Sequence, residues 1–282
     1  MTETIINIDI NKDLVMAPRS VNHKNEVRSI DIDQTSGKYA VTSPRDENGV
    51  VGGNVIIYPQ SPQLSDINIP VVLKNFRQVS SLHGPYDSRF DYVRRKLWIA
   101  DTGNDRVLKV NIDTEEVETI ISNIIYPHAM AANVNRGGVF VKAYSAYEST
   151  GVIYRFSSNG TERSKYEYTL LDDFSSSSSS EGSSPDTIPP LPFASSIVFD
   201  HVRSRVWWVD DSNVYMVDER NLQVQVYDLA ANDTGSLRAI DVELSTGNVF
   251  IVGRPISSAI EWVIAQISRD NNKFLGRAYI AS

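Results

Sequence analysis

No cysteine occurs among the 282 residues, so disulfide bridges and thiolate zinc sites are excluded. No run approaches the roughly 18 apolar residues that a membrane-spanning helix needs. The polar, acidic start of the chain, residues 1–4, also lacks the features of a signal peptide. We therefore expect a soluble protein, either cytoplasmic or associated with a particle. Its apolar content of 41% is enough for a core without covalent cross-links.

Basic residues are in the minority, with 27 Lys and Arg against 35 Asp and Glu, and the net charge is -8. A surface of that sign disfavours nonspecific binding to nucleic acid, because such binding depends on neutralising phosphates. The longest basic cluster is Arg94-Arg95-Lys96. The chain also lacks a glycine-rich phosphate loop and a Gly-x-Ser-x-Gly elbow, so the sequence nominates no catalytic residue.

Helical periodicity is absent over any stretch of ten residues, and a strand pattern recurs instead. In each copy an acidic residue or Asn, here called the anchor, precedes the centre of an apolar strand by seven residues. The five pairs are Asp33 and Ala40, Asp91 and Trp98, Asn133 and Phe140, Asp200 and Trp207, and Glu243 and Phe250. One strand precedes each anchor, and a third and usually a fourth strand follow.

Four short strands in a unit of about 42 residues are typical of β-propeller blades. The sequence therefore predicts an all-β propeller of four-stranded antiparallel blades. Between the blades we expect four large side chains to pack, those of Trp98, Phe140, Trp207 and Phe250. A β-sandwich with accidental repetition is the alternative. Five blades are recognisable, and a sixth is possible if the N-terminal segment builds one. We expect one propeller domain over residues 27–282, with insertions at 43–53 and 171–192. Residues 1–26 would then form an N-terminal arm or a sealing strand.

The stretch from Trp98 to Val107 resembles an NHL repeat, with a strand, a polar turn and a second strand. In that turn we expect Asp101 to bond backbone N–H groups and Arg106 to lie over the neighbouring blade. Gly103 and Asn104 are expected to supply the left-handed backbone. The resemblance implies propeller architecture and carries over no activity.

Some NHL-type lyases hold zinc with several histidines that face the channel. This chain has four histidines, of which His128 and His83 are placed to face a channel. Two are too few for the three protein ligands usual at catalytic zinc. We therefore expect no metal and no cofactor.

The first strand of a propeller blade lines the central channel, so its start lies at a channel mouth. Five residues before each anchor stand Arg28, Tyr86, His128, Ser195 and Arg238. These residues predict a polar ring, which could hold a small anion between Arg28 and Arg238. A channel mouth that is simply wet and polar accounts for the same residues.

The function that we predict is that of a non-enzymatic NHL-like module for protein interaction or structure. Its setting would be a larger assembly such as a virion or an appendage. The protein partner is expected at the face carrying loops 43–53 and 171–192, and the N-terminal arm could pair with a neighbouring chain. The alternative is a metal-dependent hydrolase or lyase with its site at the channel mouth.

Overall fold

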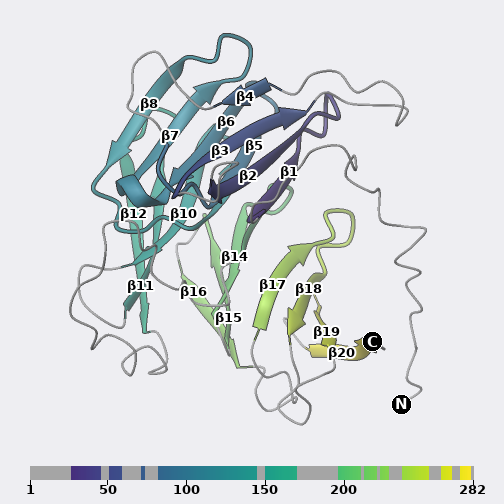
Figure 1. Cartoon of the computed structure of the whole chain (residues 1–282). Coiled ribbons are helices and arrows are strands. Elements are labelled where there is room, and N and C mark those ends of the chain that lie inside the picture. The colour runs from purple at the N-terminus through teal and green to yellow at the C-terminus, as the bar shows by residue number, and fades with distance from the viewer. Residues whose placement is uncertain are drawn as a thin grey trace, which may run out of the picture. The chain divides into compact units, whose positions relative to one another are not determined.

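The computed structural model describes residues 27–45, 51–58, 71–73, 82–144, 150–169, 196–210, 213–220, 223–228, 237–253, 262–268 and 274–280. These residues form five antiparallel sheets, each of four strands that follow one another in sequence, as Figure 1 shows. The chain is thus an all-β, five-bladed β-propeller, as the repeat predicts. The sandwich alternative is wrong.

The strands have the following bounds. Blade one holds β1 (Ser29–Ile32), β2 (Tyr39–Arg45), β3 (Val51–Tyr58) and β4 (Val71–Leu73). Blade two holds β5 (Asp87–Asp91), β6 (Lys96–Asp101), the short 3-10 turn η1 (Thr102–Asn104), β7 (Arg106–Asn111) and β8 (Val117–Ser122). Blade three holds β9 (Ala129–Asn133), β10 (Gly138–Tyr144), β11 (Thr150–Phe156) and β12 (Glu162–Thr169).

Blade four holds β13 (Ile197–Asp200), β14 (Arg205–Val209), β15 (Asn213–Asp218) and β16 (Val224–Asp228). Blade five holds β17 (Leu237–Val242), β18 (Val249–Gly253), β19 (Trp262–Ile267) and β20 (Phe274–Ile280). All five blades draw their four strands from residues 29–280. The N-terminal arm of residues 1–26 lies outside the described residues, and its role stays a prediction.

Contacts within the chain define two compact units. One unit contains blades one to three, and the other contains blades four and five. The prediction that residues 27–282 form a single domain is not tested by this division.

The anchor residues explain why the repeat has a fixed spacing. Each anchor is the last residue of the first strand of its blade or the residue directly after it, and its side chain accepts hydrogen bonds in the turn that follows. The carboxylate of Asp200, for example, accepts the backbone N–H groups of Val202 and Arg203, both at 3.1 Å. Asp33 binds the N–H groups of Thr35 and Ser36 in the same way. An acidic residue or Asn at this position therefore closes the hairpin from the first to the second strand.

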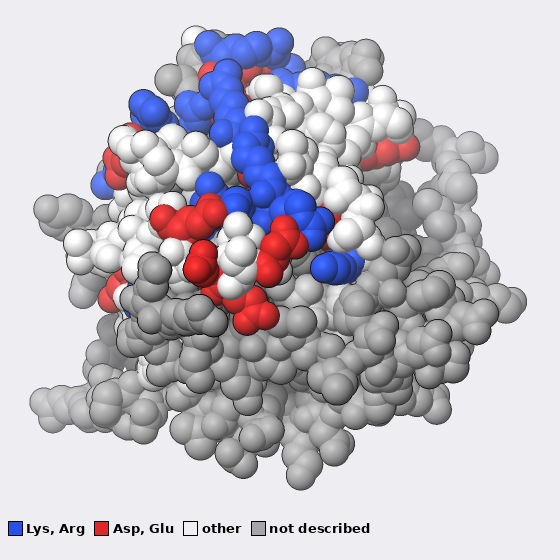
Figure 2. Space-filling view, turned by 90° about the horizontal axis from the view of Figure 1, so that it is seen from above, with Lys and Arg blue, Asp and Glu red and all other residues white. Residues whose placement is uncertain are grey.

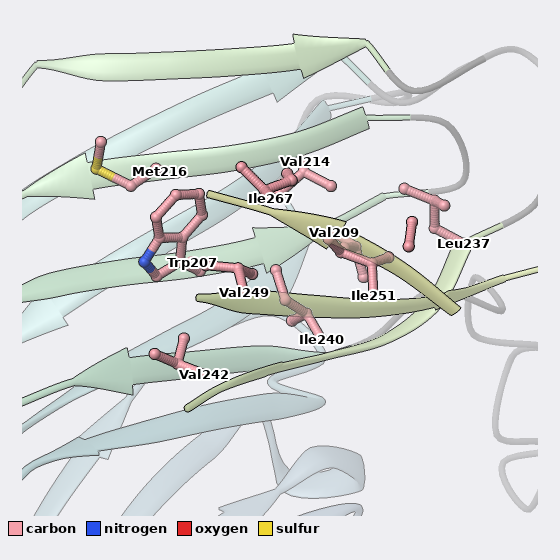
Figure 3. Packing of buried hydrophobic residues seen from close by; sticks show 11 residues of the cluster. Trp207, Val209, Val214, Met216, Leu237, Ile240, Val242, Val249, Ile251 and Ile267 are labelled. Atoms are coloured by element: carbon pink, nitrogen blue, oxygen red, sulfur yellow. The ribbon is translucent and has the colours of Figure 1, made fainter. Parts of the chain in front are cut away.

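Large apolar side chains fill the space between neighbouring blades of one unit. In the first unit, Trp98 of blade two is fully buried with Met130 and Val141 of blade three. In the second unit, Trp207 of blade four packs with Ile240 and Ile251 of blade five, as Figure 3 shows. These two tryptophans therefore lie between blades, as the repeat predicts.

Phe140 and Phe250 occupy the equivalent positions in blades three and five. Phe140 is fully buried. Phe250 is half-buried and is not part of the cluster around Trp207, so its packing between blades stays a prediction. In β18 the buried side chains are those of Val249 and Ile251, which alternate with Phe250 and join the cluster around Trp207. Phe250 points to the opposite face of its sheet.

Candidate functional site

The loop before blade two is tied to the turn η1 between β6 and β7. The carboxylate of Asp101 accepts the backbone N–H of His83 at 2.8 Å. The N–H of Gly103 donates in turn to the carbonyl oxygen of His83 at 2.8 Å. A Cβ on Gly103 would lie 2.6 Å from that oxygen, so the close approach requires glycine. The NHL-like turn thus fixes this loop against blade two.

Side chains close the same turn, partly in ways that the sequence does not reveal. Asp101 accepts hydrogen bonds from the side-chain nitrogen of Asn104 at 2.9 Å and from Nε of Arg106 at 2.6 Å. Arg106 therefore forms an ion pair across its own turn, and its contact with the neighbouring blade stays a prediction. The left-handed residue is Asp105, with φ of 48°, instead of Gly103 or Asn104.

The turn also holds the loop that leads into blade three. The hydroxyl of Thr102 donates to the carbonyl oxygen of Pro127 at 2.5 Å. Asp105 accepts the N–H of Tyr126 with its carboxylate and the N–H of Ile124 with its carbonyl, both at 3.0 Å. One hairpin therefore fixes two successive inter-blade loops at the same end of the blades.

Two residues of the predicted polar ring meet at this end. The guanidinium of Arg28 lies over the ring of Tyr86, 4.8 Å from its centre, and forms a cation–π contact between blades one and two. Arg28 is exposed, whereas Tyr86 is buried and donates its backbone N–H to Ala100 at 3.1 Å. Arg28 is thus an accessible cation at this end of the first unit.

The third predicted residue, His128, is buried at the start of β9. Its Nδ1 lies 2.9 Å from the carbonyl oxygen of Tyr126, which can only accept, so Nδ1 carries the proton. Nε2 then presents a lone pair that has no hydrogen-bond partner among the described residues. Burial, together with the positive charge of Lys142, lowers the pKa of His128 to about 3. The imidazole is therefore neutral at physiological pH.

Lys142 is a buried cation that sequence reasoning missed. It stands opposite Ala129 in the ladder of β9 and β10, and its carbonyl accepts the backbone N–H of His128 at 3.0 Å. The ring of Tyr144 lies 5.4 Å from that of His128. A signal was present in the sequence, because Lys142 interrupts an apolar strand at the position where alternation places it on the same face as Phe140.

The structure does not place the two remaining residues of the predicted ring relative to Arg28, Tyr86 and His128. Ser195 lies outside the described residues. Arg238 is half-buried in β17, in the second unit. His83, predicted near the ring, is half-buried in the loop before blade two. Convergence of all five side chains on one channel mouth stays a prediction.

Carboxylates on the first strands of blades one and two accept backbone N–H groups from the first strand of the next blade. Phe90 donates its backbone N–H to the carboxylate of Asp31 at 2.7 Å, and Met130 donates its N–H to Asp87 at 2.7 Å. Between these carboxylates lies Arg89, 3.2 Å from Asp87 and 3.7 Å from Asp31. Burial raises the pKa of both carboxyl groups, while Arg89 acts in the opposite direction.

Of these two links, the one from Asp87 to Met130 uses a position that recurs in other blades, four residues before the anchor. There a side-chain oxygen accepts a backbone N–H three residues before the anchor of the following blade. The pairs are Ser29 with Ser88, Asp87 with Met130, and Ser196 with Ile240. These contacts bind the blades together and identify polar residues of the first strands as structural.

Basic and acidic side chains lie close together on the described surface, as Figure 2 shows. The cluster named from the sequence is part of this pattern. Arg94 pairs with Asp91, Arg95 with Asp113, and Lys96 with Glu118. Each basic side chain of the longest basic cluster is therefore paired with a carboxylate.

The described residues offer neither a metal-ligand cluster nor a membrane-spanning helix. In that part of the chain, no three His, Cys, Asp or Glu side chains are grouped to hold a metal ion. No helix there has the length and apolarity needed to cross a membrane.

Comparison with known proteins identifies the fold only. No family model matches the chain, and no curated protein matches its sequence. Among solved structures, a chain in the crystal structure of a nidogen/laminin complex superposes with a TM-score of 0.58 at 13% identity. The match covers 90% of this chain and 80% of that one. The resemblance to NHL repeats therefore rests on the sequence motif from Trp98 to Val107 alone.

A hydrazine synthase from Kuenenia stuttgartiensis is also similar in structure. Its TM-score is 0.52 at 12% identity, and the match covers 73% of this chain and 52% of that chain. The superpositions show a shared propeller fold, and at identities this low they show the fold alone.

Proposed function

We propose that this propeller is a non-enzymatic, NHL-like module for protein interaction or structure. Its partner binds at the end of the blades that carries the inter-blade loops. The observation that carries the proposal is the double attachment of two such loops to one hairpin, through Asp101, Thr102 and Asp105. Binding residues are usually found on loops that a rigid scaffold positions. This end of the first unit provides such a scaffold.

The first insertion, residues 43–53, starts from the same platform. Strands β2 and β3 continue into it, with Ser43 paired to Asn54 and Arg45 paired to Val51. Gly53 adopts a positive φ of 65°, and a Cβ there would lie 2.5 Å from Pro85 in the loop before blade two. The base of the insertion is therefore packed against a fixed loop.

The centre of that insertion, residues 46–50, and the whole of the second, residues 171–192, lie outside the described residues. The second insertion follows β12, whose antiparallel direction brings the chain to the same end of blade three as His128. We place the partner-binding surface on both insertions together with the exposed Arg28.

The structural comparison supports a role in protein association. The nidogen/laminin structure contains a chain of this fold in a complex between two proteins. For this chain we infer binding to a protein partner within a larger assembly, such as a virion or an appendage.

A metal-dependent hydrolase or lyase is the rival function, and it would need a ligand such as the free Nε2 of His128. The surroundings of His128 oppose that use. The nearby positive charge of Lys142 disfavours protonation of His128, and it would repel a metal cation for the same reason. The interaction module is therefore the better-supported function.

The test is the mass of the native complex formed by the full chain and by a variant lacking residues 174–187. We expect the deletion to leave the melting temperature nearly unchanged, because loop length has a small effect on stability. The mass of the complex should decrease, since part of the partner surface is lost. The substitution Arg28→Glu should weaken the complex further.

The matched control is Val93→Glu. Val93 is exposed in the turn between β5 and β6, at the opposite end of β6 from η1. This variant should assemble like the unmodified chain. Normal assembly of the deletion variant and of Arg28→Glu would show that the partner binds elsewhere. A hydrolase or lyase activity that depends on added metal and is lost in His128→Gln would favour the rival function.

A further inference from the structure

The turn that joins β11 to β12 in blade three carries the only Asn-Gly pair within the described residues. Asn159 is exposed, and Gly160 adopts a positive φ of 82°. A Cβ on Gly160 would lie 2.7 Å from the side chain of Thr119 in β8 of blade two. Beside it, the carbonyl oxygen of Ser158 accepts a hydrogen bond from Nζ of Lys109 at 3.0 Å. The turn therefore fastens blade three to blade two, entirely within the first unit.

An asparagine that precedes a glycine can lose its side-chain amide without an enzyme. The backbone nitrogen of the glycine attacks Cγ of the asparagine, and its proton passes through water to the amide nitrogen, which leaves as ammonia. The product is a cyclic imide. Water then opens the imide at either carbonyl, which gives aspartate or isoaspartate. Glycine favours the attack because it has no side chain to shield its backbone nitrogen.

The turn presents the side chain of Asn159 in a form suited to this reaction. Its Oδ1 accepts the backbone N–H of Thr161 at 3.2 Å and the hydroxyl of Ser157. Because attack on Cγ converts Oδ1 into an oxyanion, donors already placed on that oxygen stabilise the transition state. The exposed position gives the departing ammonia and the incoming water access to solvent.

One hydrogen bond has to open before the attack. The N–H of Gly160 donates to the carbonyl oxygen of Ser157 at 3.0 Å and closes the turn. Exposed turns of this kind open locally at a small cost in free energy, without unfolding of the blades. The reaction is therefore accessible from the folded state.

We propose that Asn159 deamidates spontaneously in the folded chain, assisted by the two donors on Oδ1. Aspartate at this position would keep the path of the main chain and an oxygen for the N–H of Thr161. Isoaspartate inserts an extra methylene group into the main chain, which shifts Gly160 from its place against β8. The isoaspartate product would therefore loosen the attachment of blade three to blade two as the protein ages. This modification is independent of the partner surface proposed above.

The test is prolonged incubation of the folded chain at mildly alkaline pH, followed by peptide mapping with mass spectrometry. We expect aspartate and isoaspartate at position 159. Exposed Asn123 should keep its amide, because the β-branched side chain of Ile124 shields the nitrogen that would attack. Asn48 also precedes a glycine and lies outside the described residues, so it controls for the reaction conditions. Retention of the amide at Asn159 in the folded chain would overturn the proposal, whether or not Asn48 reacts.

Ser157→Ala tests the part played by the folded turn. It removes one donor from Oδ1, so deamidation of the folded variant should be slower by about fivefold, which corresponds to one hydrogen bond. In urea, where the turn is lost, the variant and the unmodified chain should react at the same rate. Equal rates for the two folded chains would overturn the proposed assistance by the turn.

Melting temperatures distinguish the two products. Asn159→Asp should melt like the unmodified chain, whereas the aged chain that contains isoaspartate should melt at a lower temperature. Asn159→Gln is the matched control, because its longer side chain forms the cyclic imide far more slowly. It should keep its melting temperature through the same incubation. An equal decrease in Asn159→Gln would show that ageing acts at another position and would overturn the structural effect assigned to Asn159.

Discussion

Arg203 of blade four occupies the space that a side chain on Gly247 of blade five would need. Its guanidinium pairs with the anchor Asp200 at 3.2 Å and donates to the carbonyl oxygen of Leu244 in the next blade at 3.2 Å. The first unit repeats this arrangement. There Arg94 donates to the carbonyl of Val134 at 2.8 Å, and a Cβ on Gly137 would lie 2.7 Å from Arg94. An arginine three residues after one anchor thus fits beside a glycine four residues after the next.

The substitution Gly247→Ala should therefore lower the free energy of unfolding by about 2 kcal/mol. Alanine is strained at the positive φ of 77° by about 1 kcal/mol, and its Cβ would displace Arg203 from its bonds. Chemical denaturation measures this change. Gly52→Ala is the matched control, because a Cβ there meets nothing within 4 Å. Equal stability of Gly247→Ala and Gly52→Ala would contradict the role given to Arg203.

Trp207→Ala should cost about 3–5 kcal/mol, as expected for loss of a fully buried large side chain. Trp207 is 1% exposed in the cluster between blades four and five. Phe250→Ala should cost clearly less, because Phe250 is half-buried. Urea or guanidinium unfolding of the two variants checks the difference. A larger loss for Phe250→Ala would show that the core extends to the other face of β18.

The repeat predicted the blades because its spacing has a local cause. The anchor side chain closes a hairpin, so Asp91 and Asp200 set the register of the strands that follow. Which side chains are buried depends on what covers each face of a blade. That information is absent from the repeat, so the spacing placed Trp207 between blades without revealing how deeply Phe250 is buried.

The candidate site was less accessible to sequence reasoning. Counting from the anchors brought Arg28 and Tyr86 to one end of neighbouring blades, and they do make contact there. The same count placed His128 at the start of its strand without revealing its burial or the nearby Lys142. Contacts between loops, such as that of Asp101 with His83, join residues from different segments and follow no periodic rule.

Asp101→Ala should destabilise the chain by about 3 kcal/mol and loosen the loop before blade two. The change leaves Arg106 without its buried partner and frees the N–H of His83. Amide hydrogen exchange at His83 and Gly103 should accelerate. Asp113→Ala, which breaks the exposed pair with Arg95, should leave both amides protected. Unchanged exchange in Asp101→Ala would remove the basis for a platform built on this hairpin.

The last prediction concerns the pH dependence of stability that His128 causes. Burial and the charge of Lys142 lower the pKa of His128 in the folded chain to about 3, well below its ordinary value of 6.5. Between these values the unfolded chain binds a proton that the folded chain does not. The free energy of unfolding therefore falls as the pH decreases below about 6.5, and it is unaffected by this group at higher pH.

Other groups titrate in the same range, so the contribution of His128 must be isolated by substitution. In His128→Gln the loss of stability from pH 7 to pH 5.5 should be smaller than in the unmodified chain by about 1 kcal/mol. Urea unfolding at a series of pH values measures both curves. Parallel curves for the two chains would mean that His128 binds its proton equally well when folded. The imidazole would then have to be solvated, and its Nε2 would no longer be a buried lone pair.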